Sequence, residues 1–325
     1  MKSKVVVIIP YYQKEPGILA RALRSVFSQR DVQHLEVLVI DDESPIPAAD
    51  ELKQFGSTTP FPVRVIRQSN GGPANARNRG LDELANDTTY VAFLDSDDEW
   101  VEDHIARALT ALEQGYDFYF ADLYHIGRDV SAFKRGGRVK PENYHEIIPG
   151  SGLHRYAGDM FDQTLRGNII GTPTVVYRFQ KMPQLRFKKE FVYAGEDYLF
   201  WMSITQLTDK FVFSSKVGCK CGKGVNVFSG SGWGTEKSMI RVHHEMKYRK
   251  AVNKLFKLND IQATENNRVI KGYRRTFVRD ILNRLSHRRA LDFKAVKEQM
   301  KLDPQTYLFF IPITFSILIE SLFHK

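Results

Sequence analysis

The sequence predicts an α/β fold with a mostly parallel, doubly wound sheet and a helical C-terminal extension. Short apolar runs rich in β-branched residues alternate with segments whose apolar residues recur at helical spacing. Strands that alternate with helices in this way are typical of parallel sheets with helices on both faces. The acidic stretch Asp95-Ser96-Asp97-Asp98 directly follows one apolar run. Ligands of such sheets bind at the carboxyl ends of the strands, so this stretch is the first candidate site.

The first half of the chain contains the clearest predicted elements. Residues 5–9 are apolar throughout, as expected of a central strand that is buried on both faces. Pro16 is expected in the first turn of the following helix, where no backbone N–H is needed, and residues 18–27 give that helix an apolar face. The other predicted strands are residues 35–40, 63–66, 90–94 and 118–121, and a second helix is predicted around residues 74–84.

Three carboxylates among four residues need a physical cause, because adjacent like charges repel. A hard divalent cation such as Mg²⁺ or Mn²⁺ binds carboxylate oxygens and would supply one. Asp95 and Asp97 would point to the same side if the strand continued through them. The alternative is that Ser96-Asp97-Asp98 caps a helix that starts near Glu99.

A second acidic pair and a glycine-rich turn accompany this stretch. Asp41-Asp42 ends another predicted strand, so two strand ends would form one acidic crevice, suited to a metal–pyrophosphate pair and to ligand hydroxyls. Gly71-Gly72-Pro73 is a turn that leads into a helix, from which Arg77 could reach a carboxylate or a phosphate. The turn matches neither a Walker loop nor a Gly-x-Gly-x-x-Gly dinucleotide fingerprint.

These motifs, in this order and spacing, resemble those of the family 2 glycosyltransferases, which share the GT-A fold. The resemblance covers roughly residues 4–125. Glu43 departs from the family pattern, which often has Gly there, and this departure concerns only the turn. The matching segments are Ile8-Ile9-Pro10-Tyr11-Tyr12, Val39-Ile40-Asp41-Asp42-Glu43-Ser44, Asn70-Gly71-Gly72-Pro73-Ala74-Asn75-Ala76-Arg77-Asn78 and Phe93-Leu94-Asp95-Ser96-Asp97-Asp98.

The resemblance implies a site for a nucleotide-sugar donor, expected to be a UDP-sugar. By this match Asp95 contacts the nucleotide, and Asp97, with Asp95, holds Mn²⁺ or Mg²⁺. Asp41 matches the acid that binds the base or ribose, and Arg77 matches the arginine of the helix beside it. The remaining donor-site residues implied are Pro10, Tyr12, Asp42 and Gly72.

The second half resembles the family less closely. Residues 168–178, which include Gly171 and Thr172, look like the acceptor-side loop and strand of the family. Glu196-Asp197 looks like the family's Glu-Asp motif at the start of a helix. The match makes Asp197 the base that takes the proton of the acceptor hydroxyl in an inverting transfer. The alternative is that the two acids only cap the helix.

Residues 222–234, which include Trp233, are rich in Gly and Ser and would form either a lid over the donor or an ordinary surface loop. Cys219 and Cys221 give no disulfide framework, which fits a reducing compartment, and no zinc-finger spacing. By resemblance, a C-terminal histidine, His243 or His244, is a further candidate metal ligand.

The C-terminal region is basic and then apolar. Residues 237–301 hold 18 Lys and Arg against 6 Asp and Glu, in a chain of net charge +9. This predicted helical region would meet an anionic membrane, a nucleic acid or a phosphorylated substrate, or would be a solvated face. Residues 307–319 are nearly all apolar but too few to span a bilayer, which takes about 20. They would form a packed helix, an oligomer contact or an interfacial anchor, and the preceding basic region favours the last.

The sequence and the resemblance together predict an inverting, metal-dependent glycosyltransferase. It would move a sugar, with glucose the weaker suggestion, from a UDP-sugar to a hydroxyl of a lipid-linked glycan in bacterial polysaccharide biosynthesis. Residues 1–125 are expected to bind the nucleotide-sugar, 126–236 the acceptor, and 237–325 to form the basic helical region with its apolar tail. The N-terminus lacks a signal-peptide pattern, so the protein is expected in the cytoplasm, peripheral on the inner face of the membrane.

Two other classes of protein are less consistent with the sequence. A nucleotidyltransferase acting on sugar phosphates also uses acidic metal sites, but it often has a Gly-rich loop after the first strand, where this chain has Pro10-Tyr11-Tyr12. A nucleic-acid-binding protein would use the basic C-terminal region. The acidic crevice and the lack of a nucleic-acid motif count against it, so no nucleic-acid partner is expected.

Overall fold

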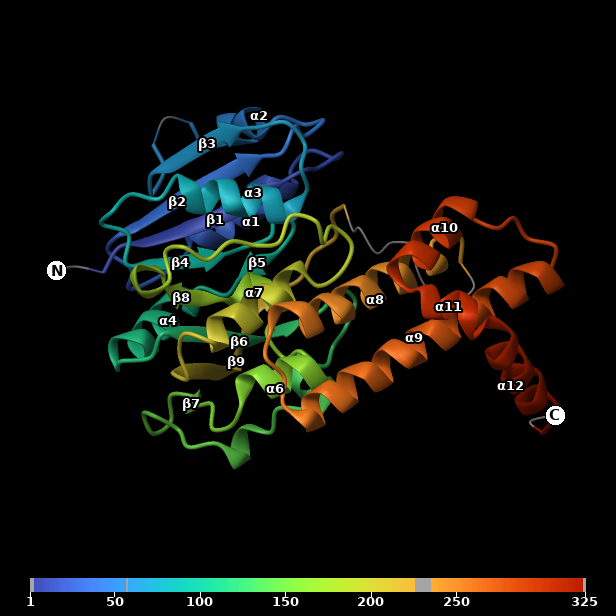
Figure 1. Cartoon of the computed structure of the whole chain (residues 1–325). Coiled ribbons are helices and arrows are strands. Elements are labelled where there is room, and N and C mark those ends of the chain that lie inside the picture. Colours follow the sequence, from blue (N-terminus) through green and yellow to red (C-terminus); the bar gives the residue numbers. More distant parts are fainter. Residues whose placement is uncertain (1–2, 57, 226–234, 324–325) are drawn as a thin grey trace. The chain divides into compact units, whose positions relative to one another are not determined.

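The computed structural model describes residues 3–56, 58–225 and 235–323 and divides into two compact units. The first unit comprises Met1–Glu190 and Asp197–Val225, and the second comprises Phe191–Glu196 and Asn226–Lys325. Figure 1 shows the sheet of the first unit and, in orange and red, the helices that make up most of the second. The chain therefore enters the second unit, returns, and enters it again.

The described strands of the first unit form one nine-stranded sheet in the order β3-β2-β1-β4-β8-β6-β9-β5, with β7 paired to β9. Neighbours from β3 to β4 are parallel, as are β6 and β9, whereas β8, β5 and β7 run antiparallel to their partners. The predicted α/β fold is confirmed. The strands are β1 (Val5–Tyr11), β2 (Leu35–Asp41), β3 (Val63–Arg67), β4 (Tyr90–Phe93), β5 (Glu99–Trp100), β6 (Phe118–Tyr124), β7 (Leu153–Arg155), β8 (Val176–Arg178) and β9 (Phe211–Lys220).

Helices cover both faces of this sheet. The odd-numbered residues of β1 pack with α1 and α4, and its even-numbered residues pack with α3 and α7. This explains its unbroken apolar run, since each fully buried Val or Ile contributes about 1.5–3 kcal/mol. The helices are α1 (Ile18–Phe27), α2 (Ala48–Leu52), α3 (Pro73–Asp82), α4 (His104–Glu113), α5 (Ala132–Gly136), α6 (Met160–Arg166) and α7 (Glu196–Thr205), with 3₁₀ turns η1 (Lys53–Phe55), η2 (Pro141–Asn143), η3 (Thr172–Thr174) and η4 (Phe179–Lys181).

One alternative reading and two local predictions were wrong. No helix starts near Glu99, because β5 pairs there with β9 and α4 begins only at His104. The strand β4 ends at Phe93, so a turn, and not strand alternation, places the acids that follow. Pro16 lies in the turn before α1, which starts after Gly17 at φ +83°, a conformation that glycine adopts without strain.

The second unit is helical, as predicted for residues 237–301. Its helices are α8 (Ser238–Leu255), α9 (Asp260–Ser286), α10 (Phe293–Leu302), α11 (Pro304–Leu308) and α12 (Phe310–Phe323). α8 and α9 lie side by side (Figure 1), and α9 begins with a capping box between Asn259 and Gln262. In the described ranges, no helix is both long and apolar enough to cross a membrane.

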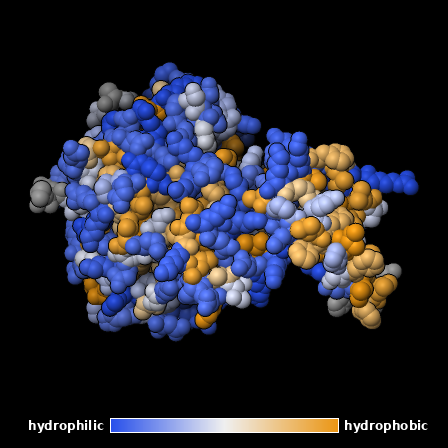
Figure 2. All heavy atoms as spheres, in the orientation of Figure 1, coloured by the Kyte–Doolittle hydropathy of each residue, from blue (hydrophilic) through white to orange (hydrophobic). Residues whose placement is uncertain are grey.

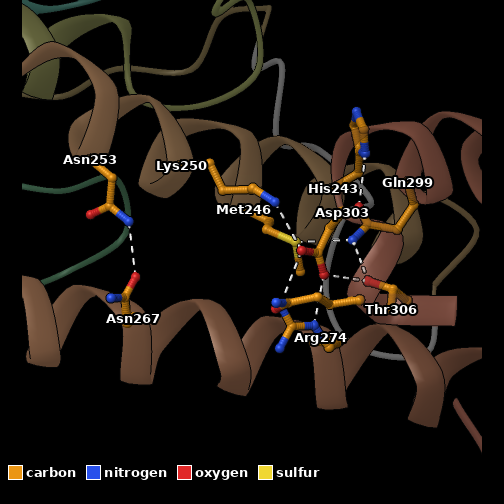
Figure 3. Close-up of polar contacts among 10 residues, drawn as sticks. His243, Met246, Lys250, Asn253, Asn267, Arg274, Gln299, Asp303 and Thr306 are labelled. Carbon is orange, nitrogen blue, oxygen red and sulfur yellow. Dashed lines mark hydrogen bonds and ion pairs between the residues drawn. The ribbon is translucent and has the colours of Figure 1, made fainter. Parts of the chain in front are cut away.

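A buried polar network joins these helices (Figure 3). The Asp303 carboxylate, between α10 and α11, accepts hydrogen bonds from Arg274 Nε (2.7 Å), Lys250 Nζ (2.9 Å) and Thr306 Oγ1 (2.8 Å). Burial alone would raise the pKa of Asp303, but hydrogen bonds from Arg274, Lys250 and Thr306 bring it down to about 2. Gln299 extends the network to Thr306 and to His243 Nδ1 (2.9 Å). The network therefore fixes α11 against α8 and α9.

Arg274→Met is expected to destabilise the second unit by about 3 kcal/mol, because a buried carboxylate loses its main partner while Lys250 remains. The measurement is amide hydrogen exchange in α9 and α11, which should accelerate together. The matched control on the same helix is Arg268→Met. Arg268 pairs with Glu265 but its side chain is 77% exposed, so this variant should change the exchange rates little. Equal effects of the two variants would contradict this role of Asp303.

Candidate active site

One cavity of about 510 Å³ in the first unit brings together residues that lie far apart in the sequence. Asp95 and Asp98 line it from the turn after β4, and Asp197 lines it from the first turn of α7. The loop before β8 contributes Gly171 and Thr172. The other lining side chains include the apolar Leu123, Phe133, Val139 and Ile170 and the basic His125, Arg135 and Arg138.

The acidic turn is held by hydrogen bonds from both sides. Asp98 N donates to Asp95 O (3.0 Å) and closes the turn, while Gly222 N donates to Asp98 Oδ1 (2.9 Å). Gln13, which follows β1, donates to Ser96 Oγ (3.1 Å). Just beyond the turn, Trp100 Nε1 donates to Pro173 O (2.5 Å). These contacts tie the turn to the loop that carries Thr172.

The carboxylates of this turn are partly desolvated. Burial, and then the charge of Asp95, raise the pKa of Asp97 to about 6. Burial, with the charges of Asp95, Cys221 and Asp97, also raises the pKa of Asp98 well above its usual range. A hard cation would relieve this repulsion, and carboxylate oxygens are the donors that it prefers.

The carboxylate oxygens available at this turn suit a cation that is shared with a substrate. In the part of the chain that the structure describes, no three His, Cys, Asp or Glu side chains are arranged as a metal site. Mg²⁺ is commonly bound by one or two carboxylates together with substrate phosphates, and Asp97 with Asp95 could supply the protein's share. Metal binding by these two residues stays a prediction.

In EDTA, ionised Asp97 should destabilise the fold. Its pKa of about 6 exceeds the ordinary 3.8, so between these values the folded protein binds more protons and the free energy of unfolding falls as pH rises. Asp97→Asn should therefore gain about 1–3 kcal/mol over wild type at neutral pH and nothing near pH 4, measured by urea denaturation. The control Asp129→Asn, in an exposed loop, should show no such difference. An unchanged Asp97→Asn at neutral pH would contradict this account.

Arg77 on α3 lies beside the acidic turn. Its Nη2 pairs with Asp95 Oδ1 (2.6 Å), and its guanidinium lies over the Phe187 ring at 5.5 Å. Asn78, the next residue of α3, fixes the backbone of Phe187 with two hydrogen bonds of 2.9 and 2.7 Å. α3 thus positions both the arginine and the ring beneath it. Asn78 and Phe187 were not among the predicted site residues; the place of Asn78 next to Arg77 in the motif was the available signal for Asn78.

Asp41 and Asp42 are both buried and bonded to backbone. Asp41 accepts from Ser44 N (2.8 Å) and Ala48 N (2.9 Å), which orders the turn into α2. Asp42 accepts from Gly71 N (2.9 Å) and Gly72 N (2.8 Å), which holds the glycine turn before α3. Each carboxylate retains further lone pairs, so nucleotide binding by either residue stays a prediction.

Asp197 occupies the first turn of α7, where its Oδ1 accepts from Tyr198 N (2.8 Å) and its Oδ2 lies 3.4 Å from Thr172 Oγ1. Burial raises the pKa of Asp197, which Arg77 partly counteracts. A carboxylate with a raised pKa at a cavity wall is suited to proton transfer. The helix-cap alternative does not account for its place in the same cavity as Asp95.

The remaining predicted site residues have more varied positions. Pro10 lies in β1 and Tyr12 directly follows it. A Cβ at Gly171 would overlap Leu123, so the loop packs closely on β6 there. Glu196 belongs to the second unit, and Trp233 lies outside the described residues.

The two histidines considered as metal ligands also belong to the second unit. His243 is buried and uses Nδ1 for its contact with Gln299, and the ring of His244 packs on Tyr193 with centroids 4.6 Å apart. A metal role for either histidine stays a prediction.

Comparison with known proteins identifies the family. The family model "Glycosyl transferase family 2" matches residues 6–179. Succinoglycan biosynthesis protein ExoW of Rhizobium meliloti is 36% identical over 236 residues, which cover 70% of this chain and 71% of that protein. The chain is a family 2 glycosyltransferase. This glycosyltransferase is also 27% identical over 215 residues to the amylovoran biosynthesis glycosyltransferase AmsB of Erwinia amylovora, with 63% and 65% of the two chains covered.

Solved structures confirm a GT-A-type fold for this glycosyltransferase. TarS 1–349 of S. aureus, in complex with UDP-GlcNAc, aligns with a TM-score of 0.55 at 18% identity and covers 87% of this chain and 73% of that one. The mannosyltransferase PcManGT of Pyrobaculum calidifontis, in complex with GDP-Man and Mn²⁺, aligns with a TM-score of 0.56 at 14% identity, with 100% and 88% covered.

Proposed function

We propose that this glycosyltransferase transfers a sugar from a UDP-sugar to a hydroxyl with inversion and with the help of a divalent metal. The observation that carries the proposal is the cavity lined by both Asp95, on the acidic turn, and Asp197, on α7. This arrangement supports a donor held at the turn and an acceptor that enters beside Asp197. The UDP-GlcNAc complex of TarS and the Mn²⁺ complex of PcManGT are consistent with this choice of donor and metal.

In the proposed mechanism, Asp197 accepts the proton of the acceptor hydroxyl as its oxygen attacks the anomeric carbon from the face opposite the diphosphate. Direct displacement inverts that carbon. Thr172, 3.4 Å from the carboxylate, helps to orient it. Asp97 and Asp95 would hold the metal, which when bound neutralises the departing diphosphate. Arg77 fixes Asp95 through their ion pair.

The proposed acceptor is a lipid-linked glycan of a bacterial polysaccharide. The names of ExoW and AmsB point to polysaccharide biosynthesis, although neither name gives an acceptor. Arg135 and Arg138 line the cavity, and their guanidinium groups make no hydrogen bond or ion pair with described residues, so these groups are available to an anionic group such as a lipid pyrophosphate. Such an acceptor would require the enzyme to work at a membrane surface, on the cytoplasmic side.

The test is a donor screen. Purified full-length protein with Mn²⁺ is incubated with UDP-glucose and other UDP-, GDP- and TDP-sugars, and nucleotide release is measured without acceptor. We expect slow release of UDP from one UDP-sugar, abolished by EDTA. Release from a GDP- or TDP-sugar would overturn the donor assignment, and release that persists in EDTA would overturn the metal dependence.

A further inference from the structure

The outer face of α12 is apolar and exposed. Ile311, Phe315, Leu318 and Leu322 are 69%, 63%, 52% and 75% exposed, and their spacing of four, three and four residues places them on one side of the helix. We call these four residues the α12 stripe. Figure 2 shows hydrophobic residues gathered over α11 and α12, the part of the chain drawn red in Figure 1. An exposed apolar patch of this kind marks an interaction surface.

The inner side of α11 and α12 carries paired polar groups together with Phe310, which packs on the apolar cluster of the second unit. On α11, Thr306 belongs to the buried network around Asp303 (Figure 3). On α12, Ser316 accepts a hydrogen bond from Arg275 (2.9 Å), and Glu320 pairs with Arg275 and with Arg279 (3.6 Å). The polar groups of these helices are therefore satisfied against α9. The four strongly exposed apolar side chains of the α12 stripe lie on the other side of the helix, where an apolar surrounding would cover them.

The neighbouring helix α10 carries the complementary charge. Lys294, Lys297 and Lys301 are all exposed, their spacing of three and four residues places them on one face, and none pairs with a described residue. A second copy of the chain docked on this region would bring two basic surfaces together. An anionic lipid surface would instead accept the apolar stripe and attract the lysines.

We propose that the α12 stripe inserts into the headgroup–acyl boundary of an anionic lipid bilayer, with the α10 lysines at the lipid phosphates. α12 has 14 residues, so it is about 21 Å long and shorter than the hydrocarbon core of about 30 Å. It therefore lies in the plane of the membrane surface and does not cross it. This goes beyond the proposed function, because the binding needs no donor, acceptor or metal.

The test is co-sedimentation of full-length protein with vesicles of phosphatidylglycerol and phosphatidylcholine, without nucleotide. Wild type should pellet at low salt, less at high salt, and not with phosphatidylcholine alone. The triple variant Ile311→Gln, Phe315→Gln, Leu318→Gln should partition at least 100-fold more weakly. Lys294→Gln, Lys297→Gln and Lys301→Gln together should weaken binding about 100-fold, from roughly a factor of five for each lysine, and should reduce its salt dependence.

Two matched control variants change the same number of exposed apolar side chains and of exposed lysines outside α10 and α12. Val130→Gln, Leu207→Gln and Ile261→Gln change three apolar side chains that are 43%, 49% and 68% exposed, and Lys140→Gln, Lys189→Gln and Lys210→Gln remove three exposed lysines of the first unit. Both triple variants should bind anionic vesicles as tightly as wild type does.

The proposal would be overturned if wild type did not bind anionic vesicles at low salt, or if the stripe variants still bound them. A wild-type dimer in sedimentation equilibrium that the stripe variant loses, without vesicle binding, would assign the face to a second copy. UDP release by the stripe variants tests the enzyme separately.

Discussion

Asp197→Asn is expected to lower kcat by roughly 10²–10⁴-fold and to leave UDP affinity unchanged. The amide keeps the size and the hydrogen bond from Tyr198 N but cannot accept the proton of an attacking hydroxyl. Because burial already raises the pKa of Asp197, loss of the charge should not destabilise the fold. Transfer rate at saturating donor and UDP binding by calorimetry are the two measurements.

The matched control is Asp162→Asn, which changes an acid in the first turn of α6 and breaks only an exposed pair with Arg166. Its activity should remain within a factor of about two of wild type. If Asp197→Asn lost UDP affinity but retained turnover at saturating donor, the carboxylate would serve donor binding and the base would lie elsewhere.

Asp97→Ala is expected to reduce transfer by roughly 10³-fold with the fold intact. Stabilisation of a departing diphosphate by a bound metal is worth several kcal/mol, and Asp97 is the carboxylate that we propose holds it. The change also removes repulsion with Asp95, so thermal stability in EDTA should not fall. Mn²⁺ titration of donor hydrolysis measures the loss, and a weaker apparent Mn²⁺ affinity should accompany it.

The control for this variant is Asp209→Ala, which removes an exposed aspartate of the first unit. It should need the same Mn²⁺ concentration as wild type. Full activity of Asp97→Ala in EDTA would exclude a metal-dependent mechanism through this residue.

Much of the fold could be predicted because burial leaves a strong pattern in sequence. Residues 5–9 are apolar at every position since both faces of β1 are covered, by α1 and α4 on one side and α3 and α7 on the other. Glu99 shows the opposite case. A two-residue strand depends on pairing with Lys220, more than a hundred residues away, and local sequence carries no trace of that partner.

The candidate site was predicted in composition more than in geometry. The acids at the ends of β2 and β4 stood out, and the structure places Asp95, Asp98 and Asp197 around one cavity. The backbone bonds of Asp42 to Gly71 and Gly72 depend on turn conformations that residue type alone does not specify. Likewise, the apolar residues 307–319 suggested a tail. Only the ion pairs of Glu320 with Arg275 and Arg279 show which side of α12 faces α9.

The short segment Phe191–Glu196 packs with the helical unit although it directly precedes Asp197 in the chain. Lys247 Nζ lies 5.0 Å from the centre of the Phe191 ring, the Tyr193 ring packs against that of His244, and Gly195 is so close to Tyr248 that a Cβ would not fit. The helical region is consequently not an exchangeable module. A gene fusion that replaced everything after residue 225 would remove the packing partners of residues 191–196, which directly precede the proposed base. Recombination between relatives should therefore spare this junction, and the helices and the residues around Gly195 should be inherited as one block.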